Sequence, residues 1–348
     1  MIDYRKKTIT KGQQQLRCGY TTGTCAAAAA KAAAVALLTG EICRDVAICL
    51  PGGENILLET ETLEHQKNCV KCGVIKDAGD DPDITNGLMI CADVEKNTSG
   101  EICIDGGEGV GRVTQPGLDQ PVGAAAINSV PRKMIQEAVE SVCQQYHYTE
   151  GLMVTISIPK GRETAEKTLN PMLGIVGGLS VLGTTGIVEP MSEKALIDTI
   201  AVDIRRHRAQ GEDILVMAPG NYGLDYLKAA CDIHSEQVIK ISNFVGDSID
   251  LAVCEGASGI VLAGHIGKLI KVAGGIMNTH SHQADARMEI LTAYAAVAGA
   301  DGETLRLVMK AVTTDAGMEI LQRCGLLSET MQLILGKIQA HVQKRAGS

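Results

Sequence analysis

The chain has 348 residues, of which 45% are hydrophobic, and its formal net charge is −9 at pH 7. This length allows two domains with buried cores. The acidic balance, the absence of Trp and the single Phe argue against nucleic-acid binding, which needs a basic surface and aromatic stacking platforms.

The first fifteen or so residues are polar and lack the apolar segment of a signal peptide. No run reaches the roughly eighteen apolar residues that span a bilayer. The 12 cysteines are scattered, which favours reduced thiols over a disulfide scaffold. Only Cys69 and Cys72 have metal-ligand spacing, and no second pair completes a zinc site. We therefore expect a cytoplasmic protein without a membrane segment or a resident metal.

The first half of the chain predicts a helix followed by short strands. Residues 22–38 are mostly alanine after a Thr/Gly turn, and Thr22 or Thr24 is the expected N-cap. Strand-like runs follow with Gly, Pro and Asn between them, at 45–53, 54–63, 87–96 and 100–117, before a second helix at 131–145. The pattern predicts an α+β domain, residues 1–150, with a mostly antiparallel sheet and a boundary near 148–151.

The second half, residues 151–348, predicts an α/β domain. A strand at 152–161 opens it or bridges to it, and an amphipathic helix follows at 192–210. Three short apolar runs that end in Gly-containing turns each precede a helical pattern, at 213–220, 238–246 and 259–267. Such repeated units are typical of a parallel sheet with crossover helices, and further helices complete the chain.

Ligands bind parallel sheets of this kind at the carboxyl ends of the strands, where loops and helix N-termini meet. The three loops at that edge are 219–223, 242–248 and 264–268. Ordinary turn chemistry explains each loop alone. Because the three loops share one edge of the sheet, a cofactor site explains them as well as turn chemistry does. Gly220, Asn221 and Gly264 are the candidate cofactor-binding residues.

The loop 76–87 contains several aspartates. Such side chains commonly cap their own turns. Closely spaced carboxylates also raise one another's pKa, which suits a general base. Asp77 and Asp81 are the candidates for that role.

Two glycine-rich stretches allow a cofactor site. The first, 105–111, offers Asp105, Gly107 and Gly109, although the residues after it indicate a returning strand and therefore a hairpin. The second, 159–192, offers the cations Lys160, Arg162 and Lys167 and then Gly183, Thr184 and Thr185. Solvent-facing charges before a tight turn are the alternative for the second stretch.

The stretch 278–289 brings His280, His282 and Asp285 together. These residue types can bind a metal ion, but N-capping by Ser281 is a sufficient structural reason for the pattern.

Several long motifs, taken together, resemble the CbiD family, the cobalt-precorrin-5B methyltransferases that modify ring carbon 1. The motifs are LRCGYTTGTCAAAAAKAA, KDAGDDPDITNG, GEGVGRVTQPGL, AINSVPRKMI, NPMLGIVGGLSVLGTTGIVEPMS and GHIGKLIKVAGGIMNTHS. The match runs from about residue 16 to about residue 291, in the family's order. The chain departs from the family pattern at Ala124, Ala125, Ser129 and His282, which concerns local substrate contacts.

The resemblance implies methyl transfer from S-adenosylmethionine to carbon 1 of a cobalt-bearing corrinoid, giving cobalt-precorrin-6A in anaerobic cobalamin biosynthesis. Cobalt arrives within the substrate, so no protein metal site is required. Two other functions are alternatives to this methyl transfer. One is a dinucleotide-dependent oxidoreductase, although no convincing GxGxxG helix is present. The other is a non-catalytic corrinoid carrier. A homo-oligomer is compatible with the sequence.

The macrocycle carries acetate and propionate groups, which Arg and Lys bind well. The candidate substrate-binding cations are Arg112, Arg132, Lys160, Arg162, Lys167 and Lys268. The hydroxyls of Thr21, Thr22 and Thr24, at the positive end of the first helix, form a candidate carboxylate cradle. For the proton, we favour His265 over Asp77 and Asp81, since it lies at the strand-end edge and imidazole side chains are common general acids and bases.

Overall fold

The computed structural model describes residues 6–347. The chain forms two compact units, Met1–Ser192 (unit 1) and Glu193–Ser348 (unit 2). The division therefore falls later than the boundary expected near 148–151. The reason is that β11 (Gly151–Ser157) pairs with two strands of the first unit's sheet, β8 (Met89–Asn97) and β9 (Ile102–Gly106).

Unit 1 is built on a five-stranded sheet of order β6-β7-β8-β11-β9. Its other strands are β6 (Glu61–His65) and β7 (Cys69–Ile75). Neighbouring strands run antiparallel except β9, which is parallel to β11. The predicted mostly antiparallel sheet is confirmed.

Within residues 6–192, four short strand pairs complete the β structure, and all are antiparallel. They are β1 (Thr8–Lys11) with β2 (Gln14–Arg17), β3 (Gly19–Tyr20) with β13 (Ile187–Val188), β4 (Asp45–Cys49) with β5 (Asn55–Glu59), and β10 (Arg112–Val113) with β12 (Ile175–Val176).

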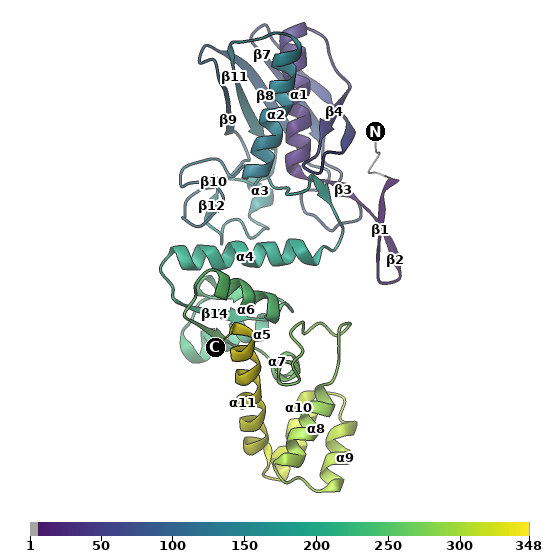
Figure 1. The fold of residues 1–348 in the computed structure, drawn as a ribbon, viewed down its shortest axis with the longest axis vertical. Helices are drawn as coiled ribbons and strands as arrows, with labels where there is room; N and C mark the ends of the chain where they lie inside the picture. The colour runs from purple at the N-terminus through teal and green to yellow at the C-terminus, as the bar shows by residue number, and fades with distance from the viewer. Residues whose placement is uncertain (1–5, 348) are drawn as a thin grey trace. The chain divides into compact units, whose positions relative to one another are not determined.

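The alanine-rich helix α1 (Thr22–Thr39) lies in the core of unit 1. Because its side chains are small, it packs closely against α2 (Ser129–Gln145) and against β7 and β8, and Figure 1 shows α1 and α2 side by side against the sheet. Within residues 6–347, α1 is the one helix long and apolar enough to cross a membrane, and 78% of that stretch is buried inside the structure. A buried core helix has this composition.

The N-cap of α1 is Thr21 rather than Thr22 or Thr24. The side-chain oxygen of Thr21 accepts a hydrogen bond from the Thr24 amide at 3.2 Å. A cap accepts from the third helical residue in this way, so the helix begins at Thr22.

Unit 2 contains a parallel sheet of three strands, as predicted, with β14 (Ile214–Ala218) between β15 (Ile239–Lys240) and β16 (Gly259–Leu262). A helix follows each strand. The helices of this part are α4 (Glu193–Ala209), α5 (Asn221–Cys231), the short 3-10 helix η2 (Ser235–Gln237), α6 (Val245–Cys254) and α7 (Ile266–Ala273). Residues of α4, α6 and α7 share a buried core with the sheet, and Leu227 of α5 packs in a smaller cluster with Ala218 and Val238.

The rest of unit 2 is helical and has a core of its own with residues of α7. Its helices are α8 (Arg287–Val297), α9 (Gly302–Lys310), α10 (Thr314–Arg323) and α11 (Leu327–Ala346). Unit 1 also has one short helix after β11, α3 (Gly161–Ala165).

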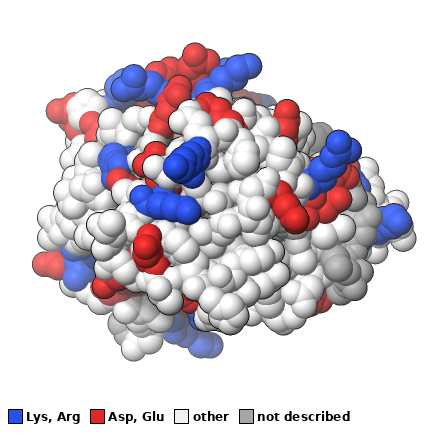
Figure 2. Space-filling view, turned by 90° about the horizontal axis from the view of Figure 1, so that it is seen from above, with Lys and Arg blue, Asp and Glu red and all other residues white. Residues whose placement is uncertain are grey.

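The face of the molecule in Figure 2 carries basic and acidic side chains close to one another among uncharged residues. A nucleic-acid-binding face is instead continuously basic.

Candidate functional site

Three of the sequence motifs meet at the N-terminus of α1. The Tyr20 amide donates to the Asp77 carbonyl at 2.7 Å, and the Gly23 amide donates to the Leu182 carbonyl at 2.9 Å. A Cβ atom on Gly19 would lie only 2.1 Å from the Ala78 carbonyl carbon. Residues 17–25, 76–87 and 182–186 are therefore packed backbone against backbone, and Gly19 permits this approach.

The buried threonines of this region bond to the protein itself. The Thr21 and Thr24 hydroxyls lie 3.0 Å apart, and Thr24 Oγ1 donates to the Gly186 carbonyl at 2.7 Å. A Cβ atom on Gly183 would lie 2.3 Å from Thr21 Oγ1. The loop 183–186 therefore lies against Thr21 and Thr24, two of the three threonines expected to bind a carboxylate, and Thr22 is buried as well.

Cys25 lies in the first turn of α1. Burial raises the pKa of its thiol to about 12, so the thiol stays protonated and acts as a small buried filler.

The aspartates of the loop 76–87 hold that loop in place. Arg17 donates through both terminal nitrogens to the two carboxylate oxygens of Asp77, at 2.6 and 2.8 Å. Asp81 Oδ1 accepts from the Met191 amide at 2.9 Å. Both contacts favour capping and loop fixation over the general-base role expected for Asp77 and Asp81.

Asp83 forms an ion pair with the buried Lys76. Burial raises the pKa of Asp83, but attraction to Lys76 and hydrogen bonds from Lys76 and Thr85 outweigh it, so the pKa lies below its usual value. This pair anchors the far end of the loop.

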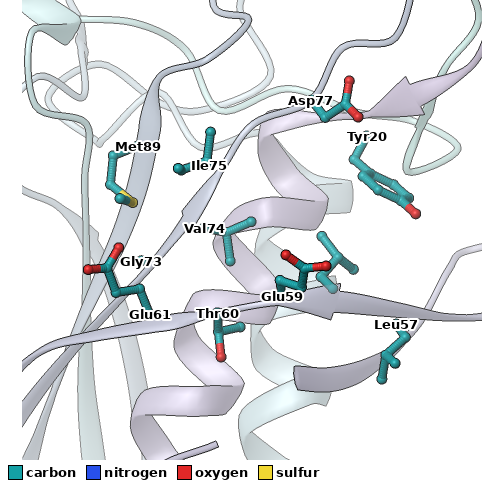
Figure 3. Close-up of a pocket in the computed structure, with 11 residues that line it drawn as sticks. Tyr20, Leu57, Glu59, Thr60, Glu61, Gly73, Val74, Ile75, Asp77 and Met89 are labelled. Atoms are coloured by element: carbon teal, nitrogen blue, oxygen red, sulfur yellow. The ribbon is translucent and has the colours of Figure 1, made fainter. Parts of the chain in front are cut away.

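A hollow of about 340 Å³ lies beside this region. Figure 3 shows Glu59, Glu61 and Asp77 around it, together with apolar side chains such as Val74 and Met89. Carboxylates repel carboxylates in such a space, so the hollow does not suit a polycarboxylate ligand.

The glycine-rich stretch 105–111 packs against the protein's own backbone. Gly109 has a left-handed backbone (φ 71°), and a Cβ atom there would lie 2.0 Å from the Ile158 carbonyl oxygen. Cβ atoms on Gly161 and Gly178 would each lie 2.3 Å from the Gly109 carbonyl oxygen. We call Gly109, Gly161 and Gly178 the glycine interlock.

The other candidates of this stretch are also engaged. A Cβ atom on Gly107 would lie 2.9 Å from the methyl carbon of Thr155. Asp105 accepts two hydrogen bonds from Arg112, at 2.7 and 2.9 Å, and these bonds hold the pKa of Asp105 below its usual value. The strand β10 follows rather than a helix, so the hairpin interpretation fits better than a cofactor loop.

The candidate cations of unit 1 fall into two groups. Arg112 is paired with Asp105, and Arg132 donates to the Ile104 carbonyl at 2.7 Å. The side chains of Lys160, Arg162 and Lys167 are exposed and make no hydrogen bond or ion pair within residues 6–347. Only this second group is available to bind a ligand without first losing a contact.

In unit 2, the carboxyl edge of the parallel sheet brings the loops after β14 and β16 together. Lys268 donates to the Pro219 carbonyl, and burial, followed by the nearby Lys271, lowers the pKa of Lys268. The ring of Tyr222 lies 5.0 Å from the ring of His265. Gly220, Asn221 and Gly264 therefore lie at one edge with an aromatic pair and a cation.

His265 is the N-cap of α7. Its Nδ1 accepts from the Gly267 amide at 3.1 Å, and its Nε2 lies 3.5 Å from Asp315 Oδ1. Because Nδ1 is an acceptor, the neutral ring carries its proton on Nε2. The Nδ1 lone pair is thus used by the helix cap.

Comparison with known proteins decides the family. The CbiD family model matches residues 9–190, and the model of the CbiD C-terminal domain matches residues 278–348. The chain belongs to the CbiD family. The resemblance found in the sequence is thereby confirmed.

Proteins called cobalt-precorrin-5B C(1)-methyltransferase match this CbiD chain over nearly its whole length. The protein from Ruminiclostridium cellulolyticum is 48% identical over 97% of this chain and 88% of its own. That from Methanocaldococcus jannaschii is 42% identical over 99% of this chain and 92% of its own. A crystal structure of cobalamin biosynthesis protein (cbiD) from Archaeoglobus fulgidus is 26% identical, covering 82% of this chain and 89% of that chain, with a TM-score of 0.45.

The side chains considered as metal ligands in this CbiD chain have local partners. His280 Nδ1 accepts from the His282 amide at 3.2 Å, and Asp285 pairs with Arg287 at 2.7 Å. Cys69 and Cys72 lie three residues apart on β7 and so point to opposite faces of the sheet. Within residues 6–347, no group of three or more His, Cys, Asp or Glu side chains could hold a metal ion.

Sequence reasoning missed the partners of the chosen residues. Arg17, which holds Asp77, lies within the first of the family motifs, and Tyr222, beside His265, lies within the loop 219–223. Asp315 lies far along the chain on α10, so no local pattern connects it with His265.

Proposed function

We propose that this protein transfers a methyl group to carbon 1 of cobalt-precorrin-5B, giving cobalt-precorrin-6A in anaerobic cobalamin biosynthesis, with S-adenosylmethionine as the donor. The observation that carries the proposal is the relatives of that name, which reach 48% identity over 97% of the chain. We expect the enzyme in the cytoplasm, and a homo-oligomer remains compatible with the sequence.

The donor supplies a methyl group on a sulfonium that is already a good leaving group. The protein must therefore mainly align the methyl carbon with ring carbon 1, exclude water and manage one proton. Strong nucleophilic or metal chemistry is not demanded of its side chains.

The carboxyl edge of the unit 2 sheet is our proposed donor site. The first turn of α5 has no side-chain cap, and a Cβ atom on Gly220 would meet nothing closer than Lys268 Nζ at 3.7 Å. Such a helix end suits a carboxylate, as in the methionine part of the donor. The Tyr222 ring, 5.0 Å from the ring of His265, offers an apolar face for adenine.

The other two glycine-rich stretches suit this task less well. Gly107 and Gly109 contact Thr155 and Ile158, and Gly183 contacts Thr21. Their missing side chains are thus explained by contacts within the chain. Thr184 and Thr185 are exposed, and Thr185 Oγ1 bonds to the backbone of Ile187.

His265 positions α7 in this proposal. Its Nδ1 already accepts from the Gly267 amide, so the helix would lose its cap if the ring acted as a base. A role in proton transfer through this ring therefore requires a conformational change.

Calorimetric titration tests the donor site. We expect saturable binding of S-adenosylhomocysteine and none of NAD(P)H. Replacing Tyr222 with Ala should weaken binding about 3- to 10-fold, from the loss of one stacking contact. Tyr226→Ala is the matched control, since Tyr226 lies one turn later on α5 and is 63% exposed against 73% for Tyr222.

Binding of NAD(P)H without S-adenosylhomocysteine would instead support the oxidoreductase. If Tyr222→Ala and Tyr226→Ala weaken binding of S-adenosylhomocysteine equally, the donor site does not lie at this edge of the sheet. Corrinoid binding without any methyl transfer would identify a carrier.

A further inference from the structure

The exposed cations Lys160, Arg162 and Lys167 lie in a segment that begins with an unusual backbone conformation. Lys160 has φ 65°, a conformation that costs a residue with a Cβ atom roughly 1–2 kcal/mol. Its carbonyl accepts from the Thr164 amide at 3.1 Å and from the Thr164 hydroxyl at 2.9 Å. The next residue, Gly161, belongs to the glycine interlock. Strain of this kind persists only where the surroundings fix it, and it often marks a ligand site.

An exposed apolar strip follows directly along the chain. Leu169, Met172 and Val176 are 46%, 39% and 56% exposed. The segment that carries them is a tight loop, closed by hydrogen bonds from the Leu173 amide to the Leu169 carbonyl at 3.0 Å and from the Ile175 amide to the Asn170 carbonyl at 2.9 Å.

The cations and the apolar strip are attached to the same point. Gly161 follows Lys160, and Gly178 lies two residues after Val176. A Cβ atom on either glycine would lie 2.3 Å from the Gly109 carbonyl oxygen. Val176 also pairs with Arg112 across β10 and β12. The interlock therefore fixes a positively charged segment beside an apolar one.

We propose that this surface binds the corrinoid substrate: Lys160, Arg162 and Lys167 bind its carboxylate side chains, and Leu169, Met172 and Val176 contact the apolar macrocycle. We call these six residues the corrinoid seat. The inference rests on the proposed function for its ligand. It is supported by charge complementarity, since these three cations have no partner within residues 6–347 and charge-assisted bonds to carboxylates are strong.

Two carboxylates on the same segment give the proposal a second, opposite prediction. Glu163 and Glu166 are also exposed and lie between the cations in sequence. They repel a polycarboxylate, so their removal should strengthen binding, whereas removal of the cations should weaken it.

The test uses two cobalt corrins and the intact protein. Cobyrinic acid keeps the free carboxylates of the macrocycle, and cobinamide carries amides in their place. Binding is measured by the change in the corrin absorption spectrum at low salt. The variant Lys160→Gln/Arg162→Gln/Lys167→Gln is compared with Arg44→Gln/Lys67→Gln/Lys133→Gln, which removes one arginine and two lysines, also exposed, from the same unit.

The seat variant should raise the Kd for cobyrinic acid roughly 10- to 100-fold, because each exposed ion pair is worth about 2- to 5-fold. The control variant should change it less than about 3-fold. Glu163→Gln/Glu166→Gln should lower the Kd about 2- to 5-fold. Val176→Ser should weaken cobyrinic acid and cobinamide alike, since it removes an apolar contact.

Equal effects of the seat and control variants would overturn the seat, as would failure of the wild-type protein to bind cobyrinic acid. Methyl transfer by the wild-type protein is measured separately. If the wild type methylates while the seat variant binds normally, the seat is wrong and the function stands. If the wild type binds cobyrinic acid through the seat but never methylates, the function fails and the seat stands.

Discussion

Replacing Gly109 with Ala tests the glycine interlock. The new Cβ atom would lie 2.0 Å from the Ile158 carbonyl oxygen, and Gly109 has φ 71°. The left-handed backbone costs an alanine roughly 1–2 kcal/mol. Overpacking against fixed atoms adds about 1–3 kcal/mol. The free energy of unfolding of unit 1 should therefore fall by about 2–5 kcal/mol.

Gly177→Ala is the matched control, because Gly177 has φ 87° in the neighbouring loop and nothing lies within 4 Å of its Cβ position. Only the backbone cost of roughly 1–2 kcal/mol applies there. The two variants should differ by about 1–3 kcal/mol, which in a unit of this size shifts the melting temperature by roughly 2–12 °C.

Thermal unfolding measures the difference, and amide hydrogen exchange locates it. Faster exchange should appear in β9, β11 and the segment around α3 in Gly109→Ala only. Cobyrinic acid binding should weaken in the same variant, since the seat depends on the interlock. Equal stability of the two variants would refute the reasoning, because the close backbone contact would then cost nothing.

Further predictions concern His265 and the Lys76–Asp83 pair. His265→Asn keeps an N-capping side chain and should preserve the free energy of unfolding, whereas His265→Ala should lower it by about 1 kcal/mol. Near-normal turnover in the Asn variant supports a positioning role. Loss of turnover in both variants supports proton transfer by His265. Lys76→Met leaves Asp83 without its buried partner. The free energy of unfolding measured in urea should therefore fall by about 3 kcal/mol or more. A fall below about 1 kcal/mol would contradict the role of this pair as an anchor of the loop. The pKa of Asp83 is lowered in the folded state. Its contribution to the free energy of unfolding is therefore complete above an unfolded pKa of about 4 and is lost as pH falls through the folded pKa. Asp83→Asn should remove that part of the acid sensitivity, and an unchanged dependence of stability on pH would contradict this assignment.

The regular features of the fold follow from local sequence. Short apolar runs before Gly-containing turns predicted β14, β15 and β16, because strand, turn and helix signals there are all local. The partners of β11 were not predictable in this way. Its pairing with β8 and β9 depends on contacts between distant segments, and this moved the division of the chain to Ser192.

The site shows a similar limit. A glycine-rich stretch marks where a backbone can approach closely, but a sequence does not show whether a ligand or another part of the chain approaches. At Gly109 it is the backbone of residues 158–161. Likewise, Asp77 is engaged by Arg17, a residue 60 positions away. Candidate residues were thus found by their chemistry, while their availability depended on tertiary contacts.

Anaerobic incubation of the intact protein with cobalt-precorrin-5B and S-adenosylmethionine labelled with ¹³C in its methyl group tests the central claim most directly. We predict that the label appears on ring carbon 1 of the corrinoid, with one S-adenosylhomocysteine formed for each methyl transferred. Label on another ring position, or S-adenosylmethionine recovered unchanged in the presence of bound corrinoid, would contradict the account.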